Sequence, residues 1–580
     1  MSRFAFRPRL VDALKGYRRE DFAADASAGV TVGIVALPLA MAFGIASGVS
    51  PAAGIFTAIV GGFLIAVLGG TKVQIGGPAG AFVALLYAIA ERYGVANLMI
   101  ATMMAGVLLF AMGALRLGQL VRYVPVSIVT GFTGGIAVII GLSQLKDFLG
   151  LSIAKMPANF FSQVAALGAH LDTVNPAALS LGVGSLALVV AWPKSYRPEH
   201  ARWRRWMARV PGTLVVMAVG IVAVSAFGLP VETIGSRFGG IPQGLPPFAA
   251  PAFDWSTAQN LVGPTISIAL LGAIESLLCA RVADSMTRDR HDPDQELMAQ
   301  GVANFVVPFF GGFAATGTVA RTVTNIRTGA RTPVAGVVHS ATLLAIVLVL
   351  APLARSVPMA TLAAILLFVA WNMGDWAAFA RLRRYSPTYR TVMLATFALT
   401  VAFDVTVAVQ VGLVLACLGF IWRISSLTRI DPVRLPSDVA TLADGSRVEA
   451  WRVFGSLFFG SVGKLEALSD PTRRQPDVVV LEMHQVINLD TTGLDALQAL
   501  FDQLDRRGST LVIAEPTEQP LSLMTRSGFV ERIGARNVFE HLDEALATLR
   551  ERHAGDPDAQ ADEDWRADDA RRADDAPADA

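Results

Sequence analysis

The stretch GGFAATGTVARTVTNIRTGARTP, Gly311 to Pro333, decides how this chain folds. It lies between two strongly apolar segments, is rich in Gly, Ala and Thr, and carries Arg321. Small residues often serve only to let helices pack closely in a membrane. An arginine at this depth costs about 2.5 kcal/mol or more, and such a charge usually marks a functional site. The surrounding sequence has to decide between a packing motif and a binding site.

The composition excludes an ordinary soluble protein. Of the 580 residues, 53% are hydrophobic and 16% are charged, whereas soluble globular chains carry about 25% charged residues. Between residues 25 and 425 apolar runs follow one another, and most of them are long enough to cross a hydrocarbon core of about 30 Å. We therefore predict a polytopic α-helical membrane protein in contact with the lipid bilayer. The net charge of +1 gives no indication of a nucleic-acid partner.

Basic residues support a count of fourteen transmembrane segments, because cytoplasmic loops collect Lys and Arg. They fall on alternate connections, so both termini are expected in the cytoplasm, in a multi-pass protein of a bacterial inner (plasma) membrane. The predicted segments are 27–48, 52–69, 79–92, 96–114, 123–143, 176–192, 210–228, 263–282, 297–310, 317–328, 335–351, 357–372, 388–404 and 406–424.

The composition changes after the last segment. Short Val- and Ile-rich strands alternate with helical stretches over residues 446–550, which is typical of a small α/β domain with a largely parallel sheet. We predict a cytoplasmic arm at 1–26, a membrane domain at 27–425, a linker at 426–445 and an acidic, disordered tail at 551–580.

The chain shows no sign of an enzyme. Its two cysteines, Cys279 and Cys417, lie inside apolar segments with no metal-site spacing, and His484 stands alone in the α/β domain. We therefore expect no cofactor, no metal and no catalytic residues.

The third and tenth segments are shorter than a bilayer crossing and follow glycine-rich breaks. The first reads TKVQIGGPAGAFVALLYAI and the second FFGGFAATGTVARTVTNI. Each is third in its half of seven, which predicts two inverted repeats of seven segments. Paired broken helices indicate a transporter's binding site. Their N-termini carry partial positive charge, so with Arg321 they are expected to bind an anion.

Two charges inside the membrane leave alternatives open. Arg321 is either part of the anion site or a structural partner of an acidic residue. Glu275, in GAIESLLCARVAD, has only apolar or small neighbours in the sequence. It suits a group that takes up a proton or faces a cation, and it equally suits a static ion pair with Arg321.

At these residues the chain resembles the SulP family of anion transporters. The similarity is carried by IVALPLAMAFGIASGVSPAAGIFTAIV, GGPAGAF, GAIESLLCA and ATGTVARTVTNIRTGARTPVAGVVHS. INLDTTGLDAL resembles the family's C-terminal STAS domain. Within the family, VPVSIVTGFTGGI and QLKDFLGL are most similar to the bacterial aerobic C4-dicarboxylic acid transporters.

The resemblance implies a core domain (segments 1–4 and 8–11) that moves like an elevator against a gate domain (segments 5–7 and 12–14), in a homodimer. It implies coupling through Glu275, to H⁺ rather than Na⁺. The substrate-binding residues that it implies are Phe43, Ala79, Gly80, Ala81, Thr318, Val319, Ala320 and Arg321.

The resemblance leaves open which anion is the substrate and whether the protein is a transporter, a channel or a sensor. Some family members have glutamine where this chain has Leu39 and an aromatic residue where it has Ala79. The resulting roomier pocket suits a C4-dicarboxylate as well as sulfate; bicarbonate with sodium coupling is the alternative. A passive anion channel, or a sensor that signals through the STAS domain, is the alternative class.

Thr491 and Thr492 occupy the place where stand-alone STAS relatives are phosphorylated. A threonine at a strand-to-helix turn either accepts a phosphoryl group or caps the helix. Phosphorylation here would regulate the protein, as would a cytoplasmic partner bound to the STAS domain.

Overall fold

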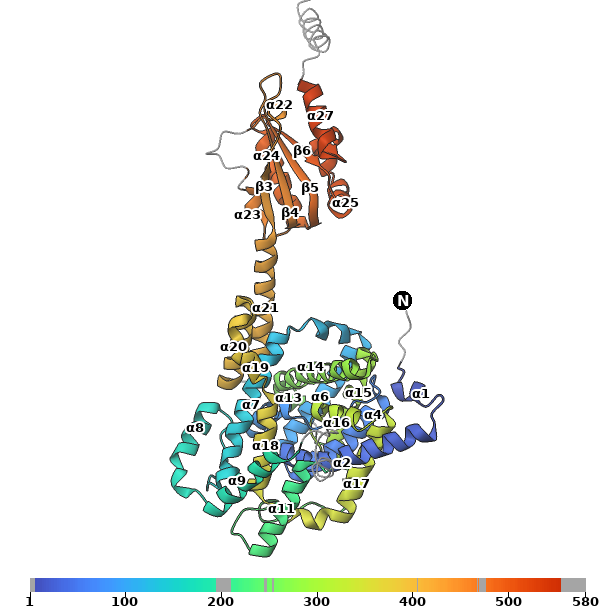
Figure 1. Ribbon diagram of the computed structural model, residues 1–580, viewed down its shortest axis with the longest axis vertical. Helices are drawn as coiled ribbons and strands as arrows, with labels where there is room; N and C mark the ends of the chain where they lie inside the picture. The colour runs from blue at the N-terminus through green and yellow to red at the C-terminus, as the bar shows by residue number, and fades with distance from the viewer. Residues whose placement is uncertain are drawn as a thin grey trace, which may run out of the picture. The chain divides into compact units, whose positions relative to one another are not determined.

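The computed structural model describes residues 6–193, 210–244, 248–252, 255–403, 405–466, 468 and 476–553. The chain divides into two compact units, Met1–Ala416 and Cys417–Ala580. The first is a bundle of helices and the second is built on a β-sheet (Figure 1). Of the predicted tail, residues 554–580 lie outside the described part.

Each predicted transmembrane segment coincides with a helix or a helical run of the structure, which confirms the fold class. Among the described residues, seven runs are long and apolar enough to cross a membrane by length and composition. They are α2 (Arg19–Ala46), the run Pro51–Leu68, α6 (Val95–Ala114), α7 (Val126–Leu149), α14 (Val262–Thr287), α17 (Val334–Ala354) and α21 (Val405–Leu427).

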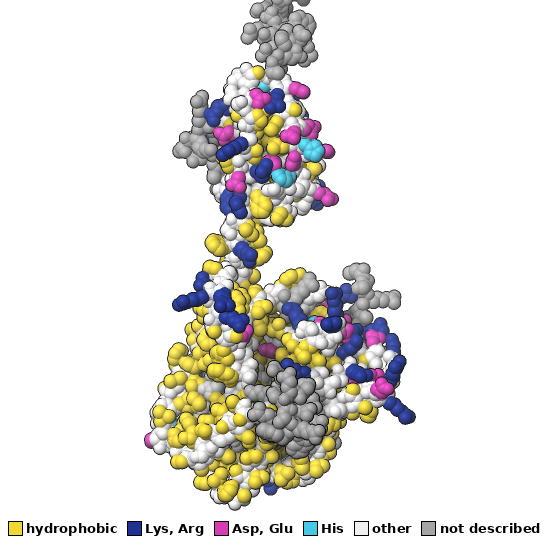
Figure 2. Space-filling view, in the orientation of Figure 1, with side chains coloured by type: hydrophobic (Ala, Val, Ile, Leu, Met, Phe, Trp, Pro, Cys, Tyr) yellow, Lys and Arg dark blue, Asp and Glu magenta, His cyan; other side chains and the backbone are white. Residues whose placement is uncertain are grey.

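The remaining segments are shorter helices. Apolar side chains cover much of the visible surface of this unit (Figure 2), as expected for helices that face lipid. The helices are α5 (Val83–Tyr93), α9 (Pro176–Ala191), α11 (Gly212–Phe227), α15 (Pro293–Val306), α16 (Val319–Arg327), α18 (Met359–Met373) and α20 (Pro387–Ala402).

Several short helices were not predicted. They are amphipathic or too short to give an apolar run of membrane length. They are α1 (Arg9–Ala13), α8 (Phe160–Ala169), α12 (Ile234–Phe238), α13 (Trp255–Asn260) and α19 (Trp376–Ala380).

The second segment contains a π-helical turn. The run consists of α3 (Pro51–Phe56), the π turn Thr57–Gly61 and α4 (Gly62–Leu68). Such turns are rare and occur mostly at functional sites. Here the hydroxyl oxygen of Thr57 accepts a hydrogen bond of 2.9 Å from the amide of Phe313, so the turn contacts the broken segment that precedes α16.

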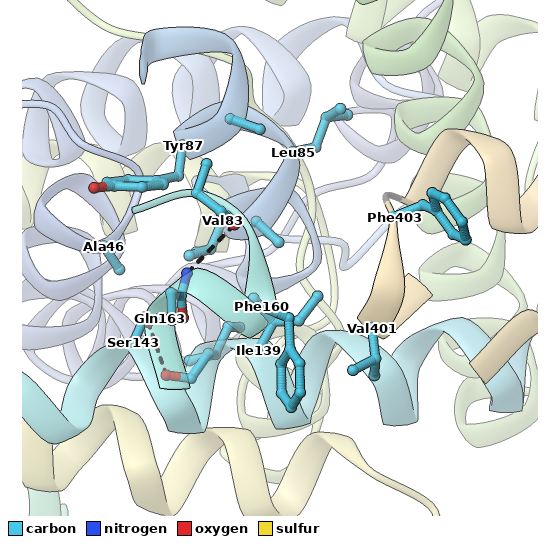
Figure 3. Close-up of a pocket in the computed structure, with 14 residues that line it drawn as sticks. Ala46, Val83, Leu85, Tyr87, Ile139, Ser143, Phe160, Gln163, Val401 and Phe403 are labelled. Carbon is cyan, nitrogen blue, oxygen red and sulfur yellow. Dashed lines mark hydrogen bonds between the residues drawn. The ribbon is translucent and has the colours of Figure 1, made fainter. Parts of the chain in front are cut away.

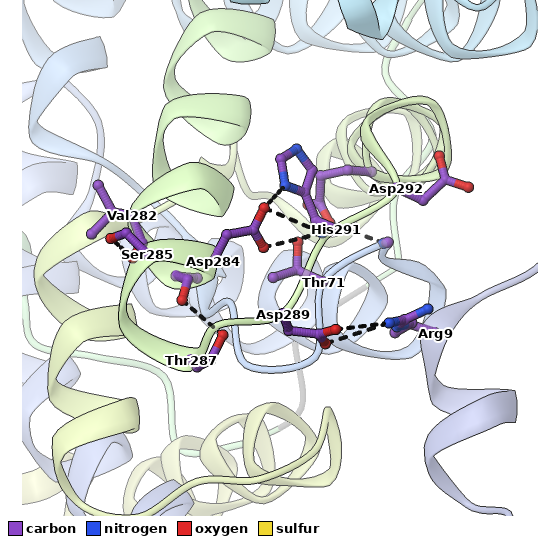
Figure 4. Close-up of polar contacts among 12 residues, drawn as sticks. Arg9, Thr71, Val282, Asp284, Ser285, Thr287, Asp289, His291 and Asp292 are labelled. Atoms are coloured by element: carbon purple, nitrogen blue, oxygen red, sulfur yellow. Dashed lines mark hydrogen bonds and ion pairs between the residues drawn. The ribbon is translucent and has the colours of Figure 1, made fainter.

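One end of the membrane unit gathers the N-terminal arm and several loops. Asp289 forms ion pairs with Arg9 at 3.2 Å and with Lys72 at 2.9 Å. Asp284 bonds the ring of His291 nearby (Figure 4). α2 begins at this end of the unit, so its last residue, Ala46, lies at the opposite end. The last residues of α7 (Leu149) and α11 (Phe227) lie at that opposite end as well.

The second unit has a five-stranded sheet of order β3-β4-β5-β6-β7. The pairs from β4 to β7 are parallel, as predicted, and β3 is antiparallel to β4. The strands are β3 (Arg429–Val433), β4 (Val448–Leu457), β5 (Val478–Leu489), β6 (Thr510–Ala514) and β7 (Val538–Phe539). The helices are α22 (Ser437–Ala440), α23 (Val462–Glu466), α24 (Thr491–Asp505), α25 (Glu518–Arg526), α26 (Phe529–Ile533) and α27 (Leu542–His553).

The predicted linker at 426–445 differs from the structure. It contains β3, whose sequence RIDPV has proline and no clear alternation, and the short helix α22. Proline is compatible with an edge strand because one side of such a strand needs no donor. Cross-strand pairing with β4 therefore builds an element that local sequence did not indicate.

Candidate functional site

Two broken segments cross at the centre of the membrane unit. Strands β1 (Gly76–Gly77) and β2 (Thr316–Gly317) pair antiparallel, with Gly76 opposite Gly317. A single 3₁₀ turn (Gly80–Phe82) leads from the first strand into α5, and the second strand leads into α16. Two half-helices therefore begin beside one short ladder, as the paired breaks predicted.

Side chains of the second segment hold the backbone of the first. The amide and the hydroxyl of Thr318 both donate to the carbonyl of Ile75, each at 2.9 Å. The amide of Ile75 donates to the Thr322 hydroxyl at 3.0 Å, and the Asn325 amide donates to the carbonyl of Val73 at 2.9 Å. The Thr318 hydroxyl proton is therefore already used within the protein.

Arg321 contacts the start of the other half-helix. Its side chain is buried, with 2% of the residue exposed, and Nη2 donates to the carbonyl of Pro78 at 2.8 Å. Its Nη1 has no hydrogen-bond partner in the described part of the chain. No described carboxylate forms an ion pair with it, so the static pair with Glu275 is absent.

Free backbone amides accompany this charge. Among the described residues, the N–H groups of Gly80, Ala81, Val319 and Ala320 donate to no other group outside their helices. Groups of this kind carry the positive end of the helix dipole. The arrangement can bind an anion through amides from both half-helices and through the guanidinium of Arg321.

The predicted lining residues divide into a covered and an open side. Gly80 lies against Phe43 and Met373, because a methyl group there would come within 3.3 Å of the Phe43 ring and 2.8 Å of the Met373 sulfur. Phe43, Ala79 and Ala81 are buried. On α16, Val319 and Ala320 are exposed.

A cavity of about 510 Å³ reaches this open side. Thr324 and Thr328 of α16 line it, and the Thr324 hydroxyl donates to the carbonyl of Ala320. The facing wall comes from α2, through Ser27 and Thr31. The cavity therefore begins one helical turn from Ala320, at Thr324, and lies towards the end of the unit where α2 begins.

Glu275 lies on α14 and is partly exposed. It forms no ion pair or hydrogen bond with the residues that the structure describes. A carboxyl group in this setting is free to exchange a proton or to meet a cation, which the sequence left open.

Sequence reasoning missed Glu296, which is completely buried. One oxygen accepts hydrogen bonds from the amide of Gly70 and the hydroxyl of Thr71, both at 3.0 Å. The other accepts from Gln74 at 2.9 Å and from Gln300 at 3.0 Å. Glu296 thus anchors the first broken segment. It lies directly before the predicted segment 297–310, and the local sequence holds no signal for its role.

His339 on α17 was also missed. It is completely buried, and neither ring nitrogen has a hydrogen-bond partner in the described part. A lone histidine in the apolar run VAGVVHSATLL was the signal that could have found it.

In the second unit Asp490 caps α24. Its carboxylate accepts the amide of Gly493 at 2.7 Å, so neither threonine is the cap that the sequence left open. Thr491 and Thr492 occupy the first turn and are exposed.

His484 does not stand alone. Its Nδ1 lies 2.8 Å from a Glu482 oxygen and 3.5 Å from a Glu515 oxygen, and the three side chains are close enough to hold a metal ion. The other Glu482 oxygen accepts from Arg452 at 2.8 Å. This charge competes with any cation, so the trio also makes sense as a polar network.

Comparison with known proteins agrees with this geometry. Residues 22–396 match the Sulfate permease family and residues 447–545 match the STAS domain. The chain is 40% identical over 538 residues to the putative sulfate transporter YvdB of Bacillus subtilis, covering 92% of this chain and 99% of that protein. It is 31% identical to the bicarbonate transporter BicA of Picosynechococcus, covering 84% and 88%.

Solved structures show the same fold. The transmembrane domain of a cyanobacterial BicA matches with a TM-score of 0.59 at 30% identity, covering 69% of this chain and 98% of that one. Murine Solute Carrier 26 family member A9, an anion transporter in the inward-facing state, matches with a TM-score of 0.81 at 18% identity and 94% coverage of both chains. These relatives are transporters and not enzymes.

Proposed function

The chain belongs to the sulfate permease family, and from this premise we propose a secondary active transporter that moves a small oxyanion across a bacterial inner membrane. The observation that supports it most directly is the buried guanidinium of Arg321, with one nitrogen unpartnered beside free amides of two half-helices. A buried charge without a carboxylate is costly. A bound anion would compensate it.

The site has one covered side and one open side, and this difference suggests how it could open alternately to the two faces of the membrane. Gly80 is covered by Met373 of α18, whereas α16 faces the cavity that reaches the end where α2 begins. α18 belongs to the gate domain and α16 to the core domain implied by the family. Movement of the core against the gate would open the covered side and close the other.

We propose that Glu275 couples transport to protons. It lies on α14, which also contacts β2 and α16, and it has no fixed partner among the described residues. Protonation would neutralise the carboxyl group and thereby favour an anion at Arg321. Na⁺ coupling would instead need the charged carboxylate.

The substrate is proposed to be sulfate or a C4-dicarboxylate. Leu39 and Ala79 are buried beside the site and offer no polar group, which suits a substrate with a carbon skeleton. Bicarbonate is the second candidate, because the relative BicA is named for it. A competition panel of sulfate, succinate, fumarate, aspartate and bicarbonate against labelled sulfate separates these candidates.

Proteoliposome uptake tests the function. We expect labelled sulfate or succinate to accumulate against its gradient when a pH difference is imposed. Glu275→Gln should remove the pH dependence and leave equilibrium binding, since only the coupling group is lost. Downhill movement alone would support the channel, and an unchanged pH profile in Glu275→Gln would make this residue structural.

The proposal includes a homodimer with cytoplasmic termini. The STAS unit would then be regulatory, through a partner protein or through phosphorylation of the exposed Thr491 or Thr492. Cross-linking in membranes and mass spectrometry of the purified protein test these points.

A further inference from the structure

A pair of adjoining cavities lies at the end of the membrane unit opposite the N-terminal arm. Their volumes are about 650 Å³ and about 220 Å³. Both are lined by Lys146 and Asp147 at the end of α7, by Ala154, and by Arg237 of α12. If the arm is cytoplasmic, these cavities face the other side of the membrane.

The charges around these cavities are unequally paired. Arg237 lies 2.8 Å from Asp147 and 3.6 Å from Glu232, so both carboxylates share one guanidinium. Lys155 lies 3.5 Å from Glu91. Among the described residues, no carboxylate lies within ion-pair distance of the remaining cation of the two cavities.

That cation is Lys146. Only 8% of the residue is exposed, although it lines both cavities. Its ammonium group has a single acceptor among the described residues, the carbonyl of Ala154 at 3.5 Å. An ammonium group has three protons to donate, so Lys146 retains donors and a charge that can act on a guest in the cavities.

The smaller cavity continues towards the central site. It shares Ala46, Tyr87 and Ser143 with a third cavity of about 40 Å³ (Figure 3). Val83 lines this third cavity. It is the first residue of α5 and follows the turn Gly80–Phe82. The cavities therefore form a row from Lys146 to the first half-helix.

We propose that Lys146 and the cavities around it form an entry site for a small oxyanion, distinct from the central site at Arg321. The entry site concentrates the anion on the face opposite the N-terminal arm before the covered side of the central site opens. The identity of the substrate class rests on the proposed function, whereas the existence of the site does not.

A thiol placed in the larger cavity tests the site without transport. Ser152 is exposed and lines that cavity. The test uses Ser152→Cys in the full chain with Cys279→Ser and Cys417→Ser, treated from the non-cytoplasmic face with anionic and cationic thiol reagents. One unit charge at about 4 Å near water changes a local ion concentration by a factor of about five. Lys146→Met should therefore lower the anionic-to-cationic rate ratio about 25-fold, because the anionic rate falls and the cationic rate rises by this factor.

Two matched variants control this measurement. Lys146→Arg keeps the charge and should keep the ratio. Arg92→Met removes a cation at the same end of the unit, outside the cavities, where Arg92 contacts the ring of Tyr93; it should also keep the ratio. Asp147→Asn removes one negative charge beside the cavities, leaves Arg237 with Glu232 alone, and should raise the ratio.

Sulfate itself is the second probe. It should slow the reaction of a neutral thiol reagent with Ser152→Cys. The half-effect concentration should rise about 25-fold in Lys146→Met, because sulfate carries two charges, and should be unchanged in Arg321→Ala. Equal reagent ratios with and without Lys146, or no protection by sulfate, would overturn the entry site. Failure of sulfate uptake with intact protection would overturn the proposed transport and leave the entry site standing.

Discussion

The two broken segments look alike in sequence but have different tasks. Both place a short strand before a half-helix, and the strands pair with each other. The second segment provides the charged group and the side chains that hold its partner, through Arg321, Thr318, Thr322 and Asn325. The first provides mainly backbone, with carbonyls of Val73, Ile75 and Pro78 as acceptors. The internal symmetry of the fold therefore does not extend to its chemistry.

The first broken segment is also held by side chains from α14 and α15. Gln74 donates to Ser276 at 3.0 Å and to Glu296 at 2.9 Å. In contrast, Asn304 exchanges two hydrogen bonds with Ala315 of the second segment, at 2.8 and 2.9 Å. A buried carboxylate holds one segment, and an uncharged amide holds the other.

The largest effect, on sulfate affinity, is expected for Arg321→Ala. This variant removes the charged group that the second broken segment provides and the first does not. A hydrogen bond to a charged group contributes about 1.5–3 kcal/mol and each 1.4 kcal/mol is tenfold in affinity, so sulfate binding should weaken about 100-fold. Equilibrium binding to purified protein measures this loss. Arg327→Ala, at the other end of α16, is the control. Unchanged affinity in Arg321→Ala would refute the anion site.

A pair of glycine substitutions compares the segments next. In Gly317→Ala the new methyl group would lie 2.1 Å from Nε2 of Gln74, a buried group that already donates to Ser276 and Glu296. In Gly80→Ala the nearest atom is the flexible Met373 sulfur at 2.8 Å. Overpacking costs about 1–3 kcal/mol, so thermal unfolding should show a clear loss for Gly317→Ala and little for Gly80→Ala. The reverse order would show that Gln74 is free to move.

Glu296→Gln tests the anchor of the first segment. Several donors converge on a carboxylate that the amide cannot replace at both oxygens. We expect a loss of about 2 kcal/mol in unfolding free energy, read as a lower midpoint in a thermal melt. Glu91→Gln, an exposed carboxylate paired only with Lys155, should leave the midpoint unchanged. Equal midpoints for the two variants would contradict the anchoring role.

The smallest effect is expected for Thr318→Val. The hydroxyl bond to Ile75 is lost, but the amide of the same residue keeps the same acceptor. The cost should be about 1 kcal/mol in stability, with sulfate affinity unchanged. If the free energy of sulfate binding falls by more than the free energy of unfolding, the hydroxyl contacts the anion. Thr318 would then bind substrate as well as hold the first broken segment.

Much of this site could be predicted because its signals are local. Glycine, proline and interrupted apolar runs mark the broken helices, and a lone arginine marks the charge. The contacts that hold the segments were not predictable in this way. Glu296 and Gln74 are 222 positions apart in the chain, and no local pattern relates them.

Other differences have the same physical origin. Strand β3 is formed by pairing with β4, not by its own sequence preference. The bond from the Thr318 hydroxyl to Ile75 depends on how the strands cross, which the local sequence does not indicate. Asp490, not a threonine, caps α24 since the helix begins one residue earlier than a threonine cap requires.

The π turn at Thr57–Gly61 changes how the second transmembrane segment is to be compared with others. A π turn contains one residue more than the α-helical repeat requires, and one residue corresponds to about 100° of rotation. The faces of α3 and α4 are therefore out of phase. A methyl group on Gly62 would lie 3.0 Å from the carbonyl of Gly76, so this phase brings a glycine against the first broken strand. An alignment of this segment without a gap would match lipid-facing positions on one side of the turn with core positions on the other.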